Sequence, residues 1–168
     1  MNLKRLLGSL LEHKVQFLVI CAWALPAYGY KRYTGDIDIF IKPTPANVKR
    51  IMRALQAIGY DLIQDATIKM FLTTKVLIRQ YVLETDIRPF VKGVTSFDRV
   101  WKNRLETKIE GLGVFVPSLE DMIKMKKAAG RSKDKLDLIE LRKIKKYQAT
   151  TSNPKSKIRN PQSPGSKE

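Results

Sequence analysis

The stretch TGDIDIFI, residues 34–41, decides how this chain folds, because it alternates acidic and apolar residues at the period of a β-strand. Successive side chains of a strand point to opposite faces, so Asp36 and Asp38 share one face while the three isoleucines point into a core. Two neighbouring carboxylates repel each other, and a hard cation such as Mg²⁺ or Mn²⁺ cancels that repulsion. The stretch therefore predicts a metal clamp for phosphate chemistry. The plainer interpretation is the polar face of a half-exposed strand.

The residues that precede this strand match a known pattern. Residues 17–25 are apolar and run into small side chains, and residues 28–34 read YGYKRYT. This arrangement resembles the nucleotidyltransferase superfamily, which has the DNA polymerase β-like fold, and within it the minimal nucleotidyltransferases of the AbiEii toxin type. Their pattern is roughly G-[GA]-x-A, then H-G-x-x-R-x-T-x-D-[IL]-D. The matching positions here are Ala22, Ala24, Gly29, Arg32, Thr34, Asp36 and Asp38.

Two positions depart from the family pattern. Cys21 stands where the family has the first glycine of its turn, and Tyr28 stands where histidine is frequent. Glycine serves in such a turn because the backbone comes close to the triphosphate and a Cβ is in the way. The resemblance implies that the backbone of Cys21 and Ala22 cradles phosphate, and the cysteine favours a catalytically impaired protein.

The family also has a third acid on a neighbouring strand, and we expect it in the β-rich segment 75–87. Adjacent strands lie about 4.8 Å apart, so an acid there can reach a metal held by Asp36 and Asp38. We assign this role to Asp86, with Glu84 as the alternative of the same strand parity. The structural alternative for either acid is a surface ion pair with Arg79 or Arg88.

A second part of the resemblance lies in residues 117–137, where the family has a helix and then K-x-x-x-x-R-x-K-D. The matching residues are Lys126, Arg131, Lys133 and Asp134. A triphosphate needs cationic side chains besides its metal, so the resemblance implies that Lys126 and Arg131, with Arg32, face the nucleotide. The alternatives are a solvated basic helix face for the lysines and a helix N-cap for Asp134.

The remaining pattern predicts an α/β (α+β) fold of the nucleotidyltransferase type, a mixed sheet with helices mainly on one side and further helices at the C-terminus. Apolar residues at helical spacing predict helices over residues 3–11 and 48–58. Ser118 and Gly130 begin and end another helix. Strands are expected around Leu18 and Ile37 and at residues 68–73, 76–87 and 113–116.

Composition divides the chain into a nucleotidyltransferase domain, residues 1–147, and a basic tail, residues 148–168, which we expect to be disordered because it is rich in Ser, Pro and Lys. The single cysteine fits a reducing, cytoplasmic location. The apolar run from Val15 to Tyr30 is short and broken by Pro26, so no membrane association is expected.

The formal net charge is +16, and only part of it lies in the tail: residues 142–168 hold eight Lys or Arg and one acid. Such a charge attracts polyanions, which favours an RNA partner, tRNA included. A generally basic proteome is the plainer explanation.

The main functional prediction is an enzyme that uses Mg²⁺ or Mn²⁺ to move a nucleoside monophosphate from an NTP to an acceptor hydroxyl. The resemblance adds a toxin role, tRNA or a protein as acceptor, and a cognate antitoxin as partner. Two alternatives stay open. One is a nucleotidyltransferase fold without chemistry that binds RNA or a protein, and the other is a Mg²⁺ phosphoesterase that cleaves nucleic acid.

Overall fold

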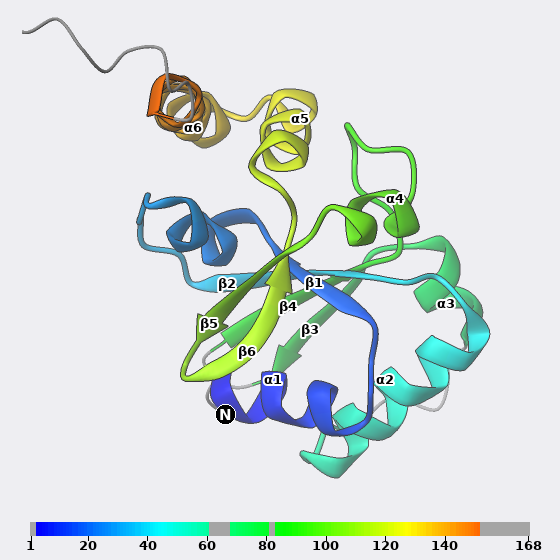
Figure 1. Ribbon diagram of the computed structural model, residues 1–168. Helices are drawn as coiled ribbons and strands as arrows, with labels where there is room; N and C mark the ends of the chain where they lie inside the picture. Colours follow the sequence, from blue (N-terminus) through cyan, green and yellow to red (C-terminus); the bar gives the residue numbers. More distant parts are fainter. Residues whose placement is uncertain (1–2, 61–67, 81–82, 152–168) are drawn as a thin grey trace, which may run out of the picture.

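The computed structural model describes residues 3–60, 68–80 and 83–151 (Figure 1). Helices and strands are interspersed through the first two thirds of the chain, and two helices follow them. In chain order the elements are α1 (Leu3–Glu12), β1 (Phe17–Ile20), the 3₁₀ helix η1 (Cys21–Tyr28), β2 (Asp36–Ile41), α2 (Pro45–Ala57), α3 (Ile68–Thr73), β3 (Val76–Gln80), β4 (Leu83–Arg88), α4 (Phe97–Lys102), β5 (Leu105–Ile109), β6 (Leu112–Val116), α5 (Leu119–Ala129) and α6 (Ser132–Thr151).

The main sheet has four strands in the order β1-β2-β4-β3. Strand β2 lies at its centre, antiparallel to β1 and parallel to β4. In the parallel pair Asp36 is opposite Glu84 and Asp38 is opposite Asp86. Residues opposite each other in a sheet point to the same face, so the register brings these acids to one surface.

The two faces of β2 pack against different helices (Figure 1). The isoleucines at 37, 39 and 41 are buried in a core that also takes the apolar sides of α1 and α2, as the alternation predicts. On the opposite face Phe40 packs beside Phe97 of α4 and belongs to a second cluster with Met125 of α5. The acids of β2 therefore share their face with Phe40, and α4 and α5 flank them.

Capping and stop signals are present at the ends of two helices, α2 and α5. Thr44 caps α2 by accepting a hydrogen bond from the backbone N–H of Asn47, with Pro45 at the first turn. Ser118 caps α5 in the same way through Asp121, and α5 ends at Gly130 in the left-handed conformation. The C-terminal helices α5 and α6 pack against each other.

Three sequence predictions of local structure were wrong. Residues 68–73 form helix α3 rather than a strand, because Ile68, Phe71 and Leu72 reach the core at helical spacing. The predicted strand 76–87 is two antiparallel strands, β3 and β4, with residues 81–82 outside the described part. Strand β5 was not expected; it pairs with β6 through a two-residue turn at Glu110 and Gly111, both with positive φ.

Helix α6 continues through Thr151, so residues 148–151 are helical rather than part of a tail that begins at 148. The rest of the predicted disordered tail, residues 152–168, lies outside the described residues. Within the described part, no helix combines the length and the apolar character needed to cross a membrane.

Candidate active site

Three predicted site acids lie on one face of the central strands. Asp38 and Asp86 are opposite each other on β2 and β4, and both are buried. Asp36, two residues before Asp38 on the same face of β2, is partly exposed. It accepts a hydrogen bond from the Thr34 hydroxyl, which lowers the pKa of the Asp36 carboxyl against the opposing effect of burial. Asp36 is therefore a carboxylate near neutral pH, as a metal clamp requires.

Arg88 joins the two buried acids. Its Nη2 lies 2.7 Å from Asp38 Oδ1 and 2.7 Å from Asp86 Oδ2. Lys75 Nζ lies 2.9 Å from the same oxygen of Asp86. The alternative that pairs Asp86 with Arg88 is thus formed, but between buried acids rather than at the surface. Glu84 is exposed and pairs instead with Arg79, as the surface alternative predicted for it.

The carboxylate oxygens of Asp38 and Asp86 are of the kind that bind a hard cation. Asp86 Oδ1 is buried and has no hydrogen-bond partner among the described residues. A buried carboxylate oxygen without a donor is costly, and a bound cation satisfies it. In the described ranges no three His, Cys, Asp or Glu side chains are gathered as a ready set of metal ligands. The residues that could hold Mg²⁺ are Asp38 and Asp86, with Asp36 beside them, and in this structure Asp38 and Asp86 are paired with Arg88 and Lys75.

Cys21 forms the turn between β1 and the 3₁₀ helix η1. Its φ is +59°, in the left-handed region where a Cβ is strained. The backbone thus has the conformation that glycine adopts readily, although the residue is cysteine. Burial and then the charge of Asp38 raise the pKa of the Cys21 thiol to about 12. The turn therefore lies close enough to Asp38 for the thiol to respond to its charge.

A buried network of charges connects α5 and α6 to the loop before β2. Lys126 is only 2% exposed, and its Nζ lies 3.0 Å from Asp134 Oδ1 and 2.7 Å from Asp137 Oδ2. Both aspartates are fully buried. Arg32 binds Asp137 at 2.9 Å and Arg131 binds Asp134 at 2.6 Å. The interpretation of Lys126 as part of a solvated helix face was wrong.

The same network fixes the start of α6. Asp134 lies in the first turn and accepts a hydrogen bond from the backbone N–H of Arg131, so it caps the helix from inside it. Burial acts to raise the pKa of Asp134, but hydrogen bonds from Arg131 and Lys126 outweigh it and hold the pKa at about 2. The hydrogen bond with Asp134 raises the pKa of Arg131. Asp134 is therefore an anion that organises two cations.

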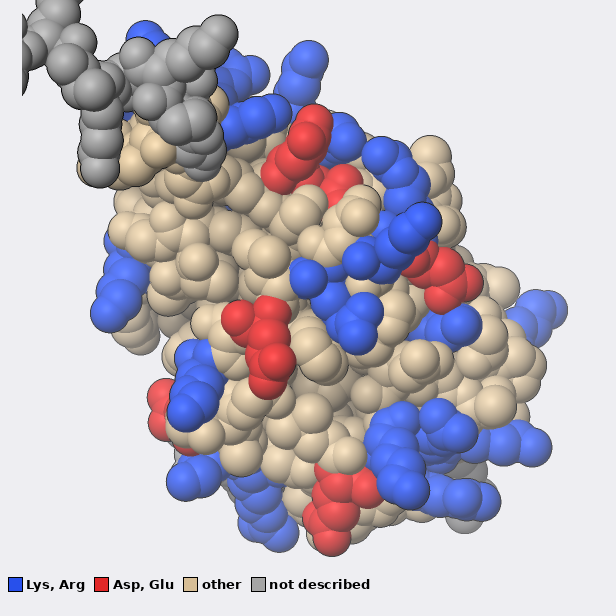
Figure 2. Space-filling view, viewed as in Figure 1, with Lys and Arg blue, Asp and Glu red and all other residues tan. Residues whose placement is uncertain are grey.

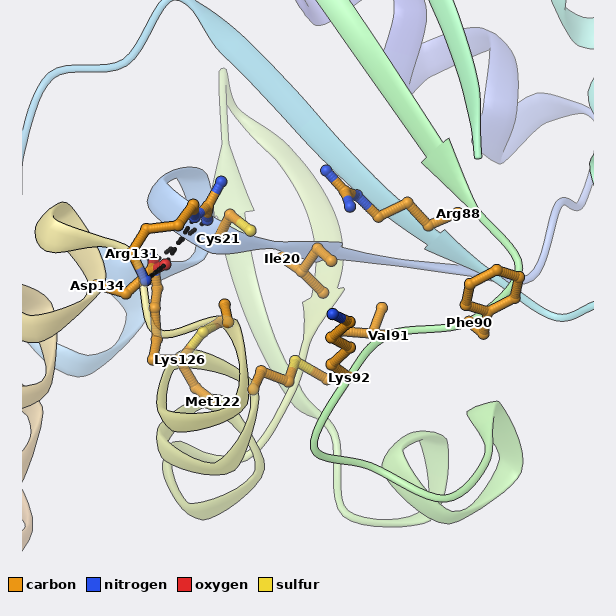
Figure 3. Close-up of a pocket in the computed structure, with 12 residues that line it drawn as sticks. Ile20, Cys21, Arg88, Phe90, Val91, Lys92, Met122, Lys126, Arg131 and Asp134 are labelled. Atoms are coloured by element: carbon orange, nitrogen blue, oxygen red, sulfur yellow. Dashed lines mark hydrogen bonds and ion pairs between the residues drawn. The ribbon is translucent and has the colours of Figure 1, made fainter. Parts of the chain in front are cut away.

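A pocket of about 250 Å³ lies beside the acids, between the turn at Cys21, the segment after β4 and helix α5. Its walls are largely apolar, from Ile20, Val91, Met122 and Met125. Charged residues approach it from several sides, as Figure 3 shows for Arg88, Lys92, Lys126 and Arg131. The guanidinium ends of Arg88 and Arg131 point toward each other across Cys21 (Figure 3).

The structure brings most of the predicted site residues to this region. Cys21, Lys126, Arg131 and Asp134 line the pocket. Arg32 is linked to it through Asp137, and Thr34 is bound to Asp36. Ala22 is buried in the first turn of η1. Lys133 is exposed, and its charge contributes to lowering the pKa of Asp36.

Sequence reasoning missed the part that further residues have in the site. Arg88 was expected only as a surface ion-pair partner, but it follows Asp86 by two positions on β4, so strand alternation was the signal that could have placed it beside both acids. Asp137 follows Asp134 by three positions on α6, which is the spacing of one helix face. Lys92 and Phe90 lie in a loop, where no periodicity could have indicated them.

The described surface carries many basic side chains. Lys and Arg are spread over the face shown in Figure 2 and outnumber the acidic side chains there. The molecule as a whole carries a formal charge of +16. Such a surface attracts polyanions.

Comparison with known proteins agrees with this arrangement. Residues 3–149 match the model of the DUF6036 family, described as a nucleotidyltransferase of unknown function. No curated protein matches the chain. The matched range contains the three acids, the turn at Cys21, the pocket and the buried network. The mixed sheet, its acids and the family match agree, and the chain belongs to the DUF6036 family of nucleotidyltransferases.

Proposed function

We propose that this protein is an active, metal-dependent nucleotidyltransferase that moves a nucleoside monophosphate from an NTP to an acceptor hydroxyl. The observation that carries the proposal is the register of Asp38 with Asp86 on parallel strands, beside a pocket with apolar walls and cations around it. The family to which the chain belongs supports the same class of reaction.

In the proposed reaction the acceptor oxygen attacks the α-phosphorus of the NTP. The bond from that phosphorus to the oxygen bridging the β-phosphate breaks, and pyrophosphate leaves with the electron pair. Asp36, Asp38 and Asp86 would hold Mg²⁺ or Mn²⁺, which when bound would neutralise the triphosphate and favour ionisation of the acceptor hydroxyl. Asp86 Oδ1, which accepts no hydrogen bond among the described residues, is available to a metal or to the acceptor proton.

The other site residues bind and orient the nucleotide in this proposal. Arg131 and Lys92 would neutralise phosphate charge at the pocket, and preorganised cations of this kind stabilise phosphoryl transfer. The contacts of Lys126 support a different role from the one the family pattern implies, because its Nζ is shared by Asp134 and Asp137. Lys126 and Arg32 would act through this network, by fixing α6 and Arg131 beside the pocket.

We further propose an AbiEii-like toxin role with an RNA acceptor, tRNA included, because the basic charge extends over the folded domain. A protein acceptor and a cognate antitoxin follow from the same resemblance. A second candidate function is an RNA-binding or partner-binding module without chemistry. Cys21 in a left-handed turn and Arg88 across the acids favour this second candidate.

Transfer of label from each of the four α-³²P-NTPs tests the proposal, with total RNA or total protein as acceptor and with Mg²⁺ or Mn²⁺. We expect labelled acceptor and equimolar pyrophosphate from the wild type, and loss of both from Asp38→Asn. Asp98→Asn is the matched control, since Asp98 is an exposed acid of α4 that pairs with Lys42 rather than with a residue of the site. RNA retention without transfer under all conditions would favour the binding module. Cleavage of RNA without NTP would favour the phosphoesterase.

A further inference from the structure

Arg88 occupies the position between the two acids that a metal ion would need. Its Nη2 is 2.7 Å from an oxygen of Asp38 and 2.7 Å from an oxygen of Asp86, and its Nε is 2.9 Å from the same Asp38 oxygen. One guanidinium therefore bridges the two carboxylates across the parallel strands. A guanidinium and a divalent cation are alternative partners for the same oxygens, because each neutralises them.

The Arg88 side chain also borders a second site, the pocket. Arg88 lines the pocket as well as contacting the acids, and its side chain is 29% exposed rather than enclosed. Its guanidinium points across Cys21 toward that of Arg131 (Figure 3). A planar guanidinium binds phosphate oxygens with two parallel hydrogen bonds. A rotation of this side chain toward the pocket would free Asp38 and add a phosphate-binding cation beside Arg131.

We infer that Arg88 competes with the metal for Asp38 and Asp86 and, once displaced, binds the phosphates of the nucleotide. This inference rests on the proposed function, because it requires a metal at the acids and a nucleotide in the pocket. It assigns Arg88 two opposite effects: the residue weakens binding of the free metal and strengthens binding of the phosphates. A residue that only stabilised the fold would not act on the two ligands in opposite directions.

Lys75 provides a matched control on the same carboxylate. Its Nζ lies 2.9 Å from Asp86 Oδ2, the oxygen that Arg88 also contacts. Lys75 is absent from the lining of the pocket, however, and is more exposed than Arg88. A change at Lys75 therefore removes a cation from Asp86 without removing a phosphate ligand.

The experiment measures two ligands separately by titration calorimetry on the full chain. The first ligand is Mn²⁺ alone, and the second is tripolyphosphate in EDTA, which reports phosphate contacts without metal. We expect Arg88→Gln to bind Mn²⁺ at least tenfold more tightly than wild type and to bind tripolyphosphate at least tenfold more weakly. Lys75→Met should also bind Mn²⁺ more tightly, with unchanged affinity for tripolyphosphate. Arg88→Lys keeps the positive charge but lacks the planar guanidinium that can donate two parallel hydrogen bonds. Its affinities for Mn²⁺ and for tripolyphosphate should therefore lie between those of wild type and Arg88→Gln.

Unchanged or weaker Mn²⁺ binding by Arg88→Gln and Arg88→Lys would overturn the inference, and so would the absence of Mn²⁺ binding from every variant. Equal loss of tripolyphosphate binding in Lys75→Met would also overturn it, because the effect would then be general charge. Circular dichroism melts check that each variant is folded, and Arg88→Lys carries the test if Arg88→Gln is not. The label-transfer assay separates the two proposals. If Arg88→Gln changes the two affinities in opposite directions but the wild type transfers no label, the enzyme proposal is refuted and the inference about Arg88 is supported. If the wild type transfers label but Arg88→Gln does not change the two affinities in opposite directions, the enzyme proposal is supported and the inference about Arg88 is refuted.

Discussion

Lys126 Nζ and the carboxylate of Asp137 lie 2.7 Å apart in the interior, where neither side chain is more than 2% exposed. The pair joins α5 to α6, and Arg32 extends it to the loop before β2. A buried charge that loses its partner is strongly destabilising, by about 3–5 kcal/mol. The relationship therefore makes Lys126 a structural support of the site.

The first prediction tests that role. Lys126→Met should lower the free energy of unfolding by about 3 kcal/mol, because Asp134 and Asp137 keep their arginines but lose the shared ammonium. Urea unfolding at pH 7 measures the change. Lys127→Met is the control, since Lys127 is an exposed neighbour on the same helix and should have little effect. Unchanged stability of Lys126→Met would instead favour a lysine held for the nucleotide.

The second prediction concerns acid. The pKa of Asp134 is held at about 2, below its value of 3.8 in an unconstrained chain. A depressed pKa stabilises the fold above the unfolded value, and that contribution is lost as pH falls toward the folded value. We expect the free energy of unfolding to fall by about 2 kcal/mol between pH 5 and pH 2 through this residue alone.

Denaturant unfolding of Asp134→Asn measures this contribution. The variant should be less stable than wild type at pH 7 and should lose less stability between pH 4 and pH 2. Asp98→Asn, which changes an exposed acid, should keep the wild-type pH profile. Identical slopes for Asp134→Asn and wild type would mean that other carboxylates cause the acid sensitivity.

The third prediction concerns Gly93, in the segment that forms one wall of the pocket. Gly93 has φ +90°, and a Cβ there would lie 2.4 Å from the backbone oxygen of Lys124 and 2.9 Å from Ala128 Cβ. Gly93→Ala should therefore destabilise the fold by about 2–3 kcal/mol, since strain and a clash with α5 add together. Gly111→Ala is the control, with φ +81° but nothing within 4 Å of the added Cβ. Equal thermal shifts for the two variants would remove the claim that the segment packs on α5 at Gly93.

The fourth prediction concerns the basic tail. Residues 152–168 hold Lys155, Lys157, Arg159 and Lys167 and few apolar side chains. Truncation after Thr151 should leave the melting temperature nearly unchanged and make RNA binding weaker and less dependent on salt, because fewer counterions are released. Fluorescence anisotropy with labelled RNA at several salt concentrations measures the slope. A full-length variant with these four residues changed to Gln should match the truncation, and equal slopes for all three proteins would assign RNA binding to the folded domain alone.

Local signals predicted the parts of the molecule that depend on nearby residues. The alternation of residues 36–41, the helix start at Ser118 and the stop at Gly130 all act within a few positions, and the structure confirms each. The parallel pairing brings Asp86 opposite Asp38 and Glu84 opposite Asp36, and of these two candidate acids only Asp86 is buried, although its role stays a prediction. What could not be predicted depends on distant residues. The contact of Arg88 with Asp38 depends on the pairing of β2 with β4, and the burial of Lys126 depends on the packing of α6 on α5.

Helix α3, residues 68–73, is a second case in which distant contacts decide the local structure, here against what its own sequence predicts. Its composition, rich in β-branched and aromatic residues, favours a strand. Phe71 is fully buried and Ile68 and Leu72 pack against the core, so tertiary packing selects the helical spacing instead. Propensity is weak enough for such contacts to override it.

The last prediction concerns Cys21, where the chain departs from the family pattern and the structure has a left-handed backbone at φ +59°. Cys21→Gly removes a strain of about 1 kcal/mol but adds freedom to the unfolded chain, so stability should change by less than about 1 kcal/mol. If a backbone must approach phosphate here, removal of the Cβ should tighten NTP binding or raise the rate of label transfer. Cys21→Ala is the matched control, because it removes the sulfur beside Asp38 and keeps the Cβ. It should therefore behave as wild type.

The other outcomes for these variants have distinct meanings. An increase in NTP affinity or transfer rate that both variants share would identify the thiol as the obstruction, and loss of transfer only in Cys21→Gly would show that the turn needs its Cβ. No transfer by wild type or Cys21→Gly, with all four NTPs and total RNA, would favour the binding module over the enzyme.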